Sequence, residues 1–136
     1  MATLLEANEV TKIYAKGQRP SLNKVSFNVA ESEFIAIMGA SGSGKTTLLN
    51  VLSTIDTPTS GSIVINGVNL KQLSDTGSAD FRRDNLGFIF QEYFLLDSLT
   101  IRENISVPLT LQKLPHKKRI IKVVEGLPNL LRVFRE

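Results

Sequence analysis

The chain has 136 residues, of which 42% are apolar, so it is long enough and apolar enough for one ordinary folded domain. It contains no cysteine, which excludes a disulfide framework or a thiolate metal site. The net charge of +3 is unevenly spread, because residues 1–112 carry 9 Lys and Arg against 11 Asp and Glu, whereas residues 113–136 carry 7 against 2. Binding to nucleic acid would depend on that basic tail alone, and we expect no nucleic-acid partner.

Membrane insertion is not indicated by the hydropathy pattern. No apolar run approaches the ~18 residues that a spanning helix needs. The first residues, MATLLEANEV, lack the basic and apolar regions of a signal peptide. We therefore predict no transmembrane segment, and contact with a membrane only through a partner.

Hydrophobic periodicity predicts the first elements. Residues 25–29 alternate between apolar and polar side chains, which predicts a half-exposed strand. The unbroken apolar run FIAIM, residues 34–38, predicts a strand buried on both faces, as in the middle of a parallel sheet. Apolar residues at helical spacing over 48–55 predict a helix that ends before Pro58.

Turn and capping signals predict the later elements. Asn66 and Gly67 lie between apolar residues and predict a hairpin. Residues 78–86 predict a short helix capped by Ser78, followed by a strand over 87–90 that ends at Gln91. Thr100 and Glu103 form a capping-box pattern, so we expect a helix there, interrupted near Pro108. Residues 113–136 form a basic tail with a further helical stripe and no clear identity.

Between the predicted strand 34–38 and the following helix lies GASGSGKTT, which matches the pattern G-x-x-x-x-G-K-[ST] at every fixed position. Glycine permits positive φ and carries no obstructing Cβ, so the backbone can curl and direct its amides at a phosphate chain. Lys45 can reach the β and γ oxygens of a triphosphate, and the Thr46 hydroxyl can take one position on Mg²⁺. The predicted phosphate-binding residues are Gly39, Ala40, Ser41, Gly42, Ser43, Gly44, Lys45, Thr46 and Thr47.

Two longer stretches carry a family resemblance. IMGASGSGKTTLLNVLSTIDTPTSGSIVINGVNL and FRRDNLGFIFQEYFLLDSLTIRENI resemble the ATP-binding subunit of ABC transporters, most closely the bacterial exporters of peptide antibiotics and lipoproteins. The resemblance covers about residues 4–112. It implies an α/β fold: a P-loop NTPase core with an N-terminal antiparallel β portion, incomplete relative to the family. Residues 1–112 would be the N-terminal part of the nucleotide-binding domain.

The resemblance also implies roles for single residues. Tyr14 matches the aromatic residue that stacks on adenine, and Thr47 matches a hydroxyl near the α-phosphate. Gln91 matches the glutamine that touches Mg²⁺ and the attacking water, so Lys45 and Gln91 would be the catalytic residues. The implied ligands are ATP and Mg²⁺. The implied partners are a membrane permease and a second nucleotide-binding subunit, at the cytoplasmic face of the plasma membrane.

Other motifs that the family uses for hydrolysis are not found after Gln91. These are an acidic pair at the end of an apolar strand, a serine- and glycine-rich signature, and a histidine. Asp97 is followed by Ser98 rather than by a glutamate, so we predict that it is a loop residue, and His116 is expected to be solvated in the basic tail. A truncated or frame-shifted gene would give such a pattern, and we expect ATP binding with little or no turnover.

Two other functions fit part of the pattern. A non-catalytic fragment could bind the permease or the full-length subunit through residues 91–103. Another P-loop protein, a GTPase or a small-molecule kinase, is the second alternative. The guanine-reading pattern N-K-x-D is not found, because Asn23 and Lys24 are followed by Val25 and Ser26.

Overall fold

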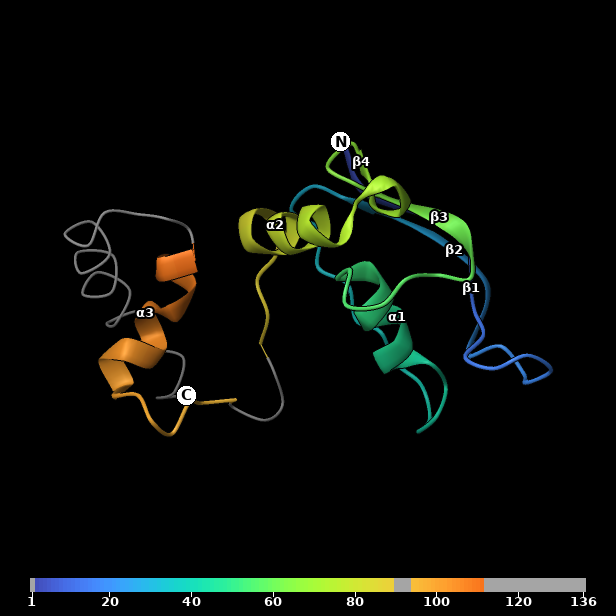
Figure 1. Ribbon diagram of the computed structural model, residues 1–136. Helices are drawn as coiled ribbons and strands as arrows, with labels where there is room; N and C mark the ends of the chain where they lie inside the picture. The colour runs from blue at the N-terminus through green and yellow to red at the C-terminus, as the bar shows by residue number, and fades with distance from the viewer. Residues whose placement is uncertain (1, 90–93, 112–136) are drawn as a thin grey trace. The chain divides into compact units, whose positions relative to one another are not determined.

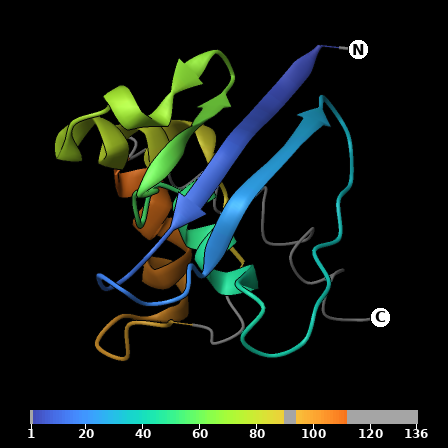
Figure 2. The same cartoon turned by 90° about the vertical axis from the view of Figure 1, so that its right-hand side faces the viewer.

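The computed structural model describes residues 2–89 and 94–111, and the chain divides into two compact units, residues 1–82 and 83–136 (Figure 1). The first unit contains a four-stranded antiparallel sheet in the order β2-β1-β3-β4. Its strands are β1 (Thr3–Lys12), β2 (Leu22–Ala30), β3 (Ser60–Ile65) and β4 (Val68–Asn69). The long neighbours β1 and β2 run side by side in Figure 2.

The sheet confirms two predictions from sequence. In β2 the apolar side chains of the predicted strand 25–29 are half-buried, while Ser26 and Asn28 are exposed. Between β3 and β4, Asn66 and Gly67 have φ values of 49° and 75°, as a two-residue hairpin turn requires.

β1 contains a bulge around Glu9. Its pairing slips by one residue against both neighbours, between Ala7 and Val10 on the β2 side and between Asn8 and Thr11 on the β3 side. Ala7 and Val10 are both buried although they are three positions apart, since the extra residue restores the inward orientation.

A glycine faces this bulge on β3. Gly61 has φ 88°, and a Cβ there would lie 2.5 Å from the carbonyl oxygen of Glu9. The bulge therefore leaves no room for a larger residue at this position.

Helix α1 (Lys45–Leu52) lies against one face of the sheet (Figures 1 and 2). The predicted helix 48–55 is confirmed in its first part, where Leu48 and Val51 are buried. It ends at Leu52, earlier than predicted, because Thr54 takes a left-handed φ of 59° and Ile55 is exposed. The core of the first unit consists of buried side chains from the strands, the helices and the 3₁₀ turn after β4: Ala7, Val10, Leu22, Leu48, Val51, Ile63, Ile65, Leu70 and Phe81.

That short 3₁₀ helix, η1 (Leu70–Gln72), leads into α2 (Asp75–Asn85). Helix α2 begins three residues before the predicted range 78–86, and the predicted Ser78 cap is wrong. The Ser74 hydroxyl accepts a hydrogen bond of 3.1 Å from the Gly77 amide instead. Ser74 lies just outside the helix, where a hydroxyl can reach the amides that have no partner within the helix.

Two predicted strands do not form in the described residues. Residues 34–38 are irregular, with Phe34 94% exposed and Met38 88% exposed, so the prediction of a strand buried on both faces is wrong. Residues 87–89 are also irregular; residues 90 and 91, the rest of that prediction, lie outside the described part. An apolar run becomes a strand only when a neighbouring strand accepts its hydrogen bonds, and no described segment pairs with either run.

Helix α3 (Ile101–Leu111) belongs to the second unit. The predicted capping box is confirmed, because the Thr100 amide donates to Glu103 Oε2 at 2.7 Å and the Glu103 amide donates to Thr100 Oγ1 at 3.3 Å. The predicted interruption at Pro108 is wrong, since the helix continues through this residue. A proline removes only one hydrogen bond of the ladder, and the flanking turns persist. No helix within residues 2–89 and 94–111 has the length and apolar character to cross a membrane.

Candidate functional site

The glycine-rich loop before α1 has the curled backbone predicted from sequence. Gly42 and Gly44 adopt left-handed φ values of 77° and 94°. Gly39 does not have a left-handed φ, and a Cβ there would lie 2.5 Å from Ser43 Oγ, so the Ser43 side chain would have to move. Gly44 meets both requirements, since a Cβ would lie 2.4 Å from the carbonyl oxygen of Ser21. The glycines thus allow a turn that leads directly into the first residue of α1.

The ammonium group of Lys45 spans this loop. Its Nζ donates to the carbonyl oxygens of Gly39 and Ala40, each at 2.7 Å, and to Ser43 Oγ at 3.4 Å. These contacts place a positive charge at the curl of the backbone. They also hold the two ends of the loop close to each other.

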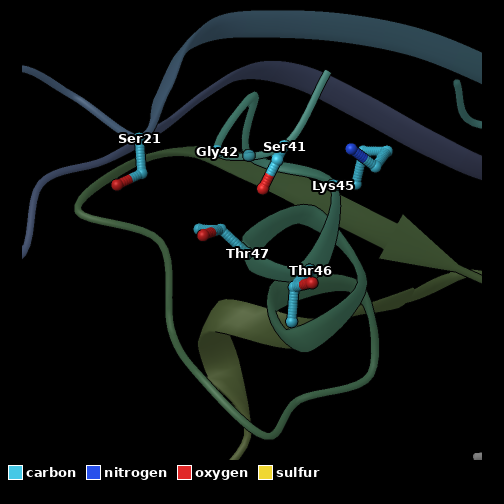
Figure 3. Close-up of a pocket in the computed structure, with 7 residues that line it drawn as sticks. Ser21, Ser41, Gly42, Lys45, Thr46 and Thr47 are labelled. Carbon is cyan, nitrogen blue, oxygen red and sulfur yellow. The ribbon is translucent and has the colours of Figure 1, made fainter. Parts of the chain in front are cut away.

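An open pocket of about 600 Å³ lies beside the loop and the beginning of α1. In Figure 3 the hydroxyl side chains of Ser21, Ser41 and Thr47 are grouped at the beginning of the helix. The residues that line the pocket are Ser21, Ser41, Gly42, Gly44, Lys45, Thr46 and Thr47. All of them except Ser21 belong to the set predicted from the motif.

The pocket suits an anion. The amides in the first turn of an α-helix have no partner within the helix and carry a partial positive charge. The first turn of α1 has no acidic residue, and Lys45 adds a full positive charge. Hydroxyl groups of the lining supply further donors. This is the arrangement that binds phosphate groups at helix N-termini.

Metal binding by protein side chains alone is not indicated in the described part of the chain, which has no group of three His, Cys, Asp or Glu residues arranged around a common point. Thr46 is among the residues that line the pocket, and its hydroxyl suits a Mg²⁺ ion that takes its other ligands from phosphate and water. Gln91, the other predicted metal contact, lies outside the described residues. Asp97 lies in an exposed turn, in agreement with the loop prediction, and His116 is not among the described residues.

Tyr14 lies just beyond β1 and is 57% exposed. It is not part of the pocket lining. Its ring centroid is 5.0 Å from the ammonium of Lys12, the last residue of β1. The tyrosine therefore presents an aromatic surface to solvent, with a cation beside it.

Lys12 also makes an ion pair with Asp56 and donates to the carbonyl oxygen of Thr57 at 2.8 Å. Burial raises the pKa of Asp56, but the hydrogen bonds from Lys12, the Thr57 amide and Tyr14, together with the positive charge of Lys12, outweigh this and hold the pKa below its ordinary value. The carboxylate is thus kept ionised beside the lysine. The pair connects the end of β1 to the segment after α1.

Sequence reasoning missed Ser21 and Lys12. Ser21 joins the pocket because its amide donates to the carbonyl oxygen of Lys12 at 2.8 Å, which closes the loop between β1 and β2. Neither residue belongs to a local motif. Only the pairing of distant segments brings Ser21 to the pocket and Lys12 to Asp56.

Comparison with known proteins gives a consistent result. The sequence pattern of the family described as ABC transporter matches residues 22–132. The chain is 51% identical to the ABC transporter ATP-binding protein YxdL of Bacillus subtilis, covering 96% of this chain and 53% of that protein. It is 50% identical to the bacitracin export ATP-binding protein BceA of Halalkalibacterium halodurans, covering 84% and 46%. The chain thus spans about half the length of the curated relatives it matches.

A solved structure is similar as well. The ATP-binding cassette MJ0796, in a dimeric post-hydrolysis state bound to ADP and Pi, superposes with a TM-score of 0.81 at 36% identity. The match covers 91% of this chain and 56% of that one. It confirms the predicted fold class, an α/β P-loop core with an N-terminal antiparallel β portion.

Proposed function

Because the chain belongs to the ABC transporter family, we propose that it is part of an ATP-binding subunit that couples ATP binding and hydrolysis to export through a membrane permease. Export is the direction named for the similar BceA protein. The observation that carries the proposal is the curled loop with Lys45 across it, at the beginning of a helix without acidic residues in its first turn.

In this proposal the triphosphate of ATP lies in the pocket. The amides of residues 39–47 and the ammonium of Lys45 bind its oxygens, and the hydroxyl of Thr47 lies near the α-phosphate. The adenine stacks on Tyr14, because an exposed aromatic ring offers a flat apolar surface to a planar base.

A bound Mg²⁺ ion would neutralise part of the phosphate charge. Thr46 and Gln91 would hold it, together with phosphate oxygens and water. The chain's own contribution is to place one hydroxyl, that of Thr46, at the beginning of the helix.

Titration of the full chain with Mg·ATP tests phosphate binding. We expect Lys45→Ala to weaken binding about tenfold or more, because a hydrogen bond to a charged group contributes about 1.5–3 kcal/mol. Lys24→Ala is the matched control, since this lysine is 71% exposed and lies on the sheet rather than in the pocket. A Lys45→Ala protein that unfolds at the same temperature and still binds Mg·ATP like the parent would refute the proposal. Competition by GTP as strong as by ATP would favour the other P-loop proteins.

Turnover by this chain alone should be slow. The motifs that the family uses to place the attacking water are not found after Gln91, so we propose binding with little or no hydrolysis. A purified chain that hydrolyses ATP at ~1 s⁻¹ or faster, as intact enzymes do, would contradict this.

The proposed partners are the permease and a second nucleotide-binding subunit, at the inner face of the plasma membrane. One observation favours a second candidate function, that of a non-catalytic permease-binding chain. Phe94, Leu95 and Leu96 are 68%, 65% and 51% exposed, within the range 91–103 predicted to face the permease. Capture of the chain by a purified permease, equally with and without ATP and also with Lys45→Ala, would support this second function over the first.

A further inference from the structure

The side chain of Lys12 joins three parts of the first unit: the end of β1, the segment after α1, and the ring of Tyr14. We propose that Lys12 is a positioning residue that orients Tyr14 for the base of the bound nucleotide. This inference rests on the proposed function. It assigns to Lys12 a role in binding the nucleotide base, separate from the residues proposed for the phosphates and the metal.

The surroundings of the Lys12 ammonium fix its position. It pairs with Asp56 Oδ1 and donates to the Thr57 carbonyl oxygen, and the lysine side chain is only 12% exposed. A cation held in this way does not move freely with solvent. It lies 5.0 Å from the ring centroid of Tyr14, within the range of a cation–π contact.

This contact leaves one ring face for a ligand. The ammonium occupies one side of the Tyr14 ring, whereas the side chain as a whole is 57% exposed. In the proposal the planar base stacks on the face opposite the ammonium. Fixing the ring in advance lowers the entropy that binding must otherwise remove.

The backbone of Lys12 anchors the loop between β1 and β2, which contains Tyr14. Its carbonyl oxygen accepts a hydrogen bond of 2.8 Å from the Ser21 amide, which holds together the two ends of the loop formed by residues 13–20. Thr59 adds a second anchor, because its hydroxyl accepts the Ile13 amide at 3.0 Å. Tyr14 follows directly after this anchored position.

The anchored end of the loop lies next to the residues that are proposed to bind phosphate. Ser21 lines the pocket, and its carbonyl oxygen lies so close to Gly44 that no Cβ fits there. Lys12 therefore ties the residue proposed to hold the base to the backbone proposed to hold the phosphates. It is not itself placed to bind phosphate, since its ammonium is already paired with Asp56 and Thr57.

The test compares a ligand that has a base with one that has none. The full chain is titrated with Mg·ATP and with magnesium tripolyphosphate. We expect Lys12→Met to weaken ATP binding about threefold to tenfold and to leave tripolyphosphate binding within about twofold. Tyr14→Ala should have the same selective effect. Lys24→Met is the control for loss of a lysine charge on the sheet, and it should change neither affinity.

A double-mutant cycle separates positioning from general destabilisation. If Lys12 acts through the tyrosine ring, Lys12→Met should not further weaken ATP binding once Tyr14 is alanine. Equal loss of both ligands in Lys12→Met, full additivity with Tyr14→Ala, or an unchanged ratio of the two affinities would each overturn the inference. Failure of the proposed function looks different, because Lys45→Ala would then leave the binding of both ligands unchanged.

Discussion

Gly44 is the residue at which the phosphate loop and the loop between β1 and β2 touch. Substitution by alanine combines a left-handed φ of 94° with a Cβ at 2.4 Å from the Ser21 carbonyl oxygen. We expect Gly44→Ala to displace this backbone, to weaken Mg·ATP binding at least tenfold, and to lower the unfolding temperature measured by circular dichroism.

The control for Gly44 is Gly67, which has a left-handed φ of 75° but no atom within 4 Å of the position that an added Cβ would take. Gly67→Ala therefore carries the conformational cost alone, about 1–2 kcal/mol, and should leave ATP affinity unchanged. Equal effects of both substitutions on ATP binding would show that the contact with Ser21 has no importance for the pocket.

We expect the stability of the first unit to depend on pH through Asp56. The pKa of its carboxyl is lower in the folded protein than in the unfolded chain, so the folded state binds its proton less readily. The stabilisation from Asp56 is therefore fully present above the unfolded pKa of about 4 and is lost as the pH falls through the lower folded value. The free energy of unfolding, measured with urea, should be lower for Asp56→Asn than for the parent at pH 7. This difference should shrink below about pH 4.

If the free energies of unfolding of the parent and of Asp56→Asn differed by the same amount from neutral to strongly acidic pH, the ion pair with Lys12 would have no part in acid sensitivity.

Among the helices, α3 shows the clearest capping. Thr100 and Glu103 exchange hydrogen bonds at its N-terminus. The Thr100 amide and the Thr100 hydroxyl both donate to Glu103 Oε2 and hold the pKa of Glu103 below its ordinary value. Thr100→Ala removes the hydroxyl acceptor and should destabilise the first turn by about 1 kcal/mol. Hydrogen exchange of the amides of residues 101–104 in the full chain should become faster.

The comparison for α3 is Thr110→Ala. The Thr110 hydroxyl donates to the Ser106 carbonyl oxygen in the last turn, far from the cap. If this substitution accelerated exchange at residues 101–104 as much as Thr100→Ala does, the capping box could not be the cause.

At the level of elements, the sequence predicted what depends on near neighbours. The hairpin at Asn66 and Gly67, the cap at Thr100 and the alternation in β2 are local, and each is confirmed. The predicted Ser78 cap was wrong by one helical turn, since Ser74 and Ser78 both have a hydroxyl able to cap and it is the Ser74 hydroxyl that accepts the Gly77 amide.

Features that depend on distant pairing were predicted poorly. The apolar run 34–38 has the composition of a buried strand, but a strand also needs a partner, which its own residues cannot supply. In the site, the loop geometry could be predicted from the spacing of the glycines. The positions of Ser21 and Lys12 could not, because they depend on the hydrogen bond that closes the loop between two strands.

For the whole molecule, the exposed apolar side chains of residues 34–38 favour self-association. Phe34 and Met38 are 94% and 88% exposed and lie in one irregular segment of the first unit. Burying this area between copies releases the water around it. We expect the chain to form larger species as its concentration rises, and the double substitution Phe34→Ser with Met38→Ser to reduce them, measured by size exclusion with light scattering.

Leu4→Ser is the control for this prediction, because Leu4 is only 39% exposed and lies within β1. Self-association that persists unchanged after substitution of Phe34 and Met38 would place the associating surface elsewhere. The prediction concerns this chain, which spans about half the length of its curated relatives.

The one-residue slip around Glu9 decides on which side of the sheet the end of β1 presents its side chains. Val10 and Lys12 share a face because they are two positions apart, and the slip turns that face inward together with Ala7. A chain one residue shorter at this point would direct Val10 outward and carry the ammonium of Lys12 through the thickness of the sheet, away from Asp56. The length of β1, and not only its composition, therefore determines whether a charge reaches the ring of Tyr14.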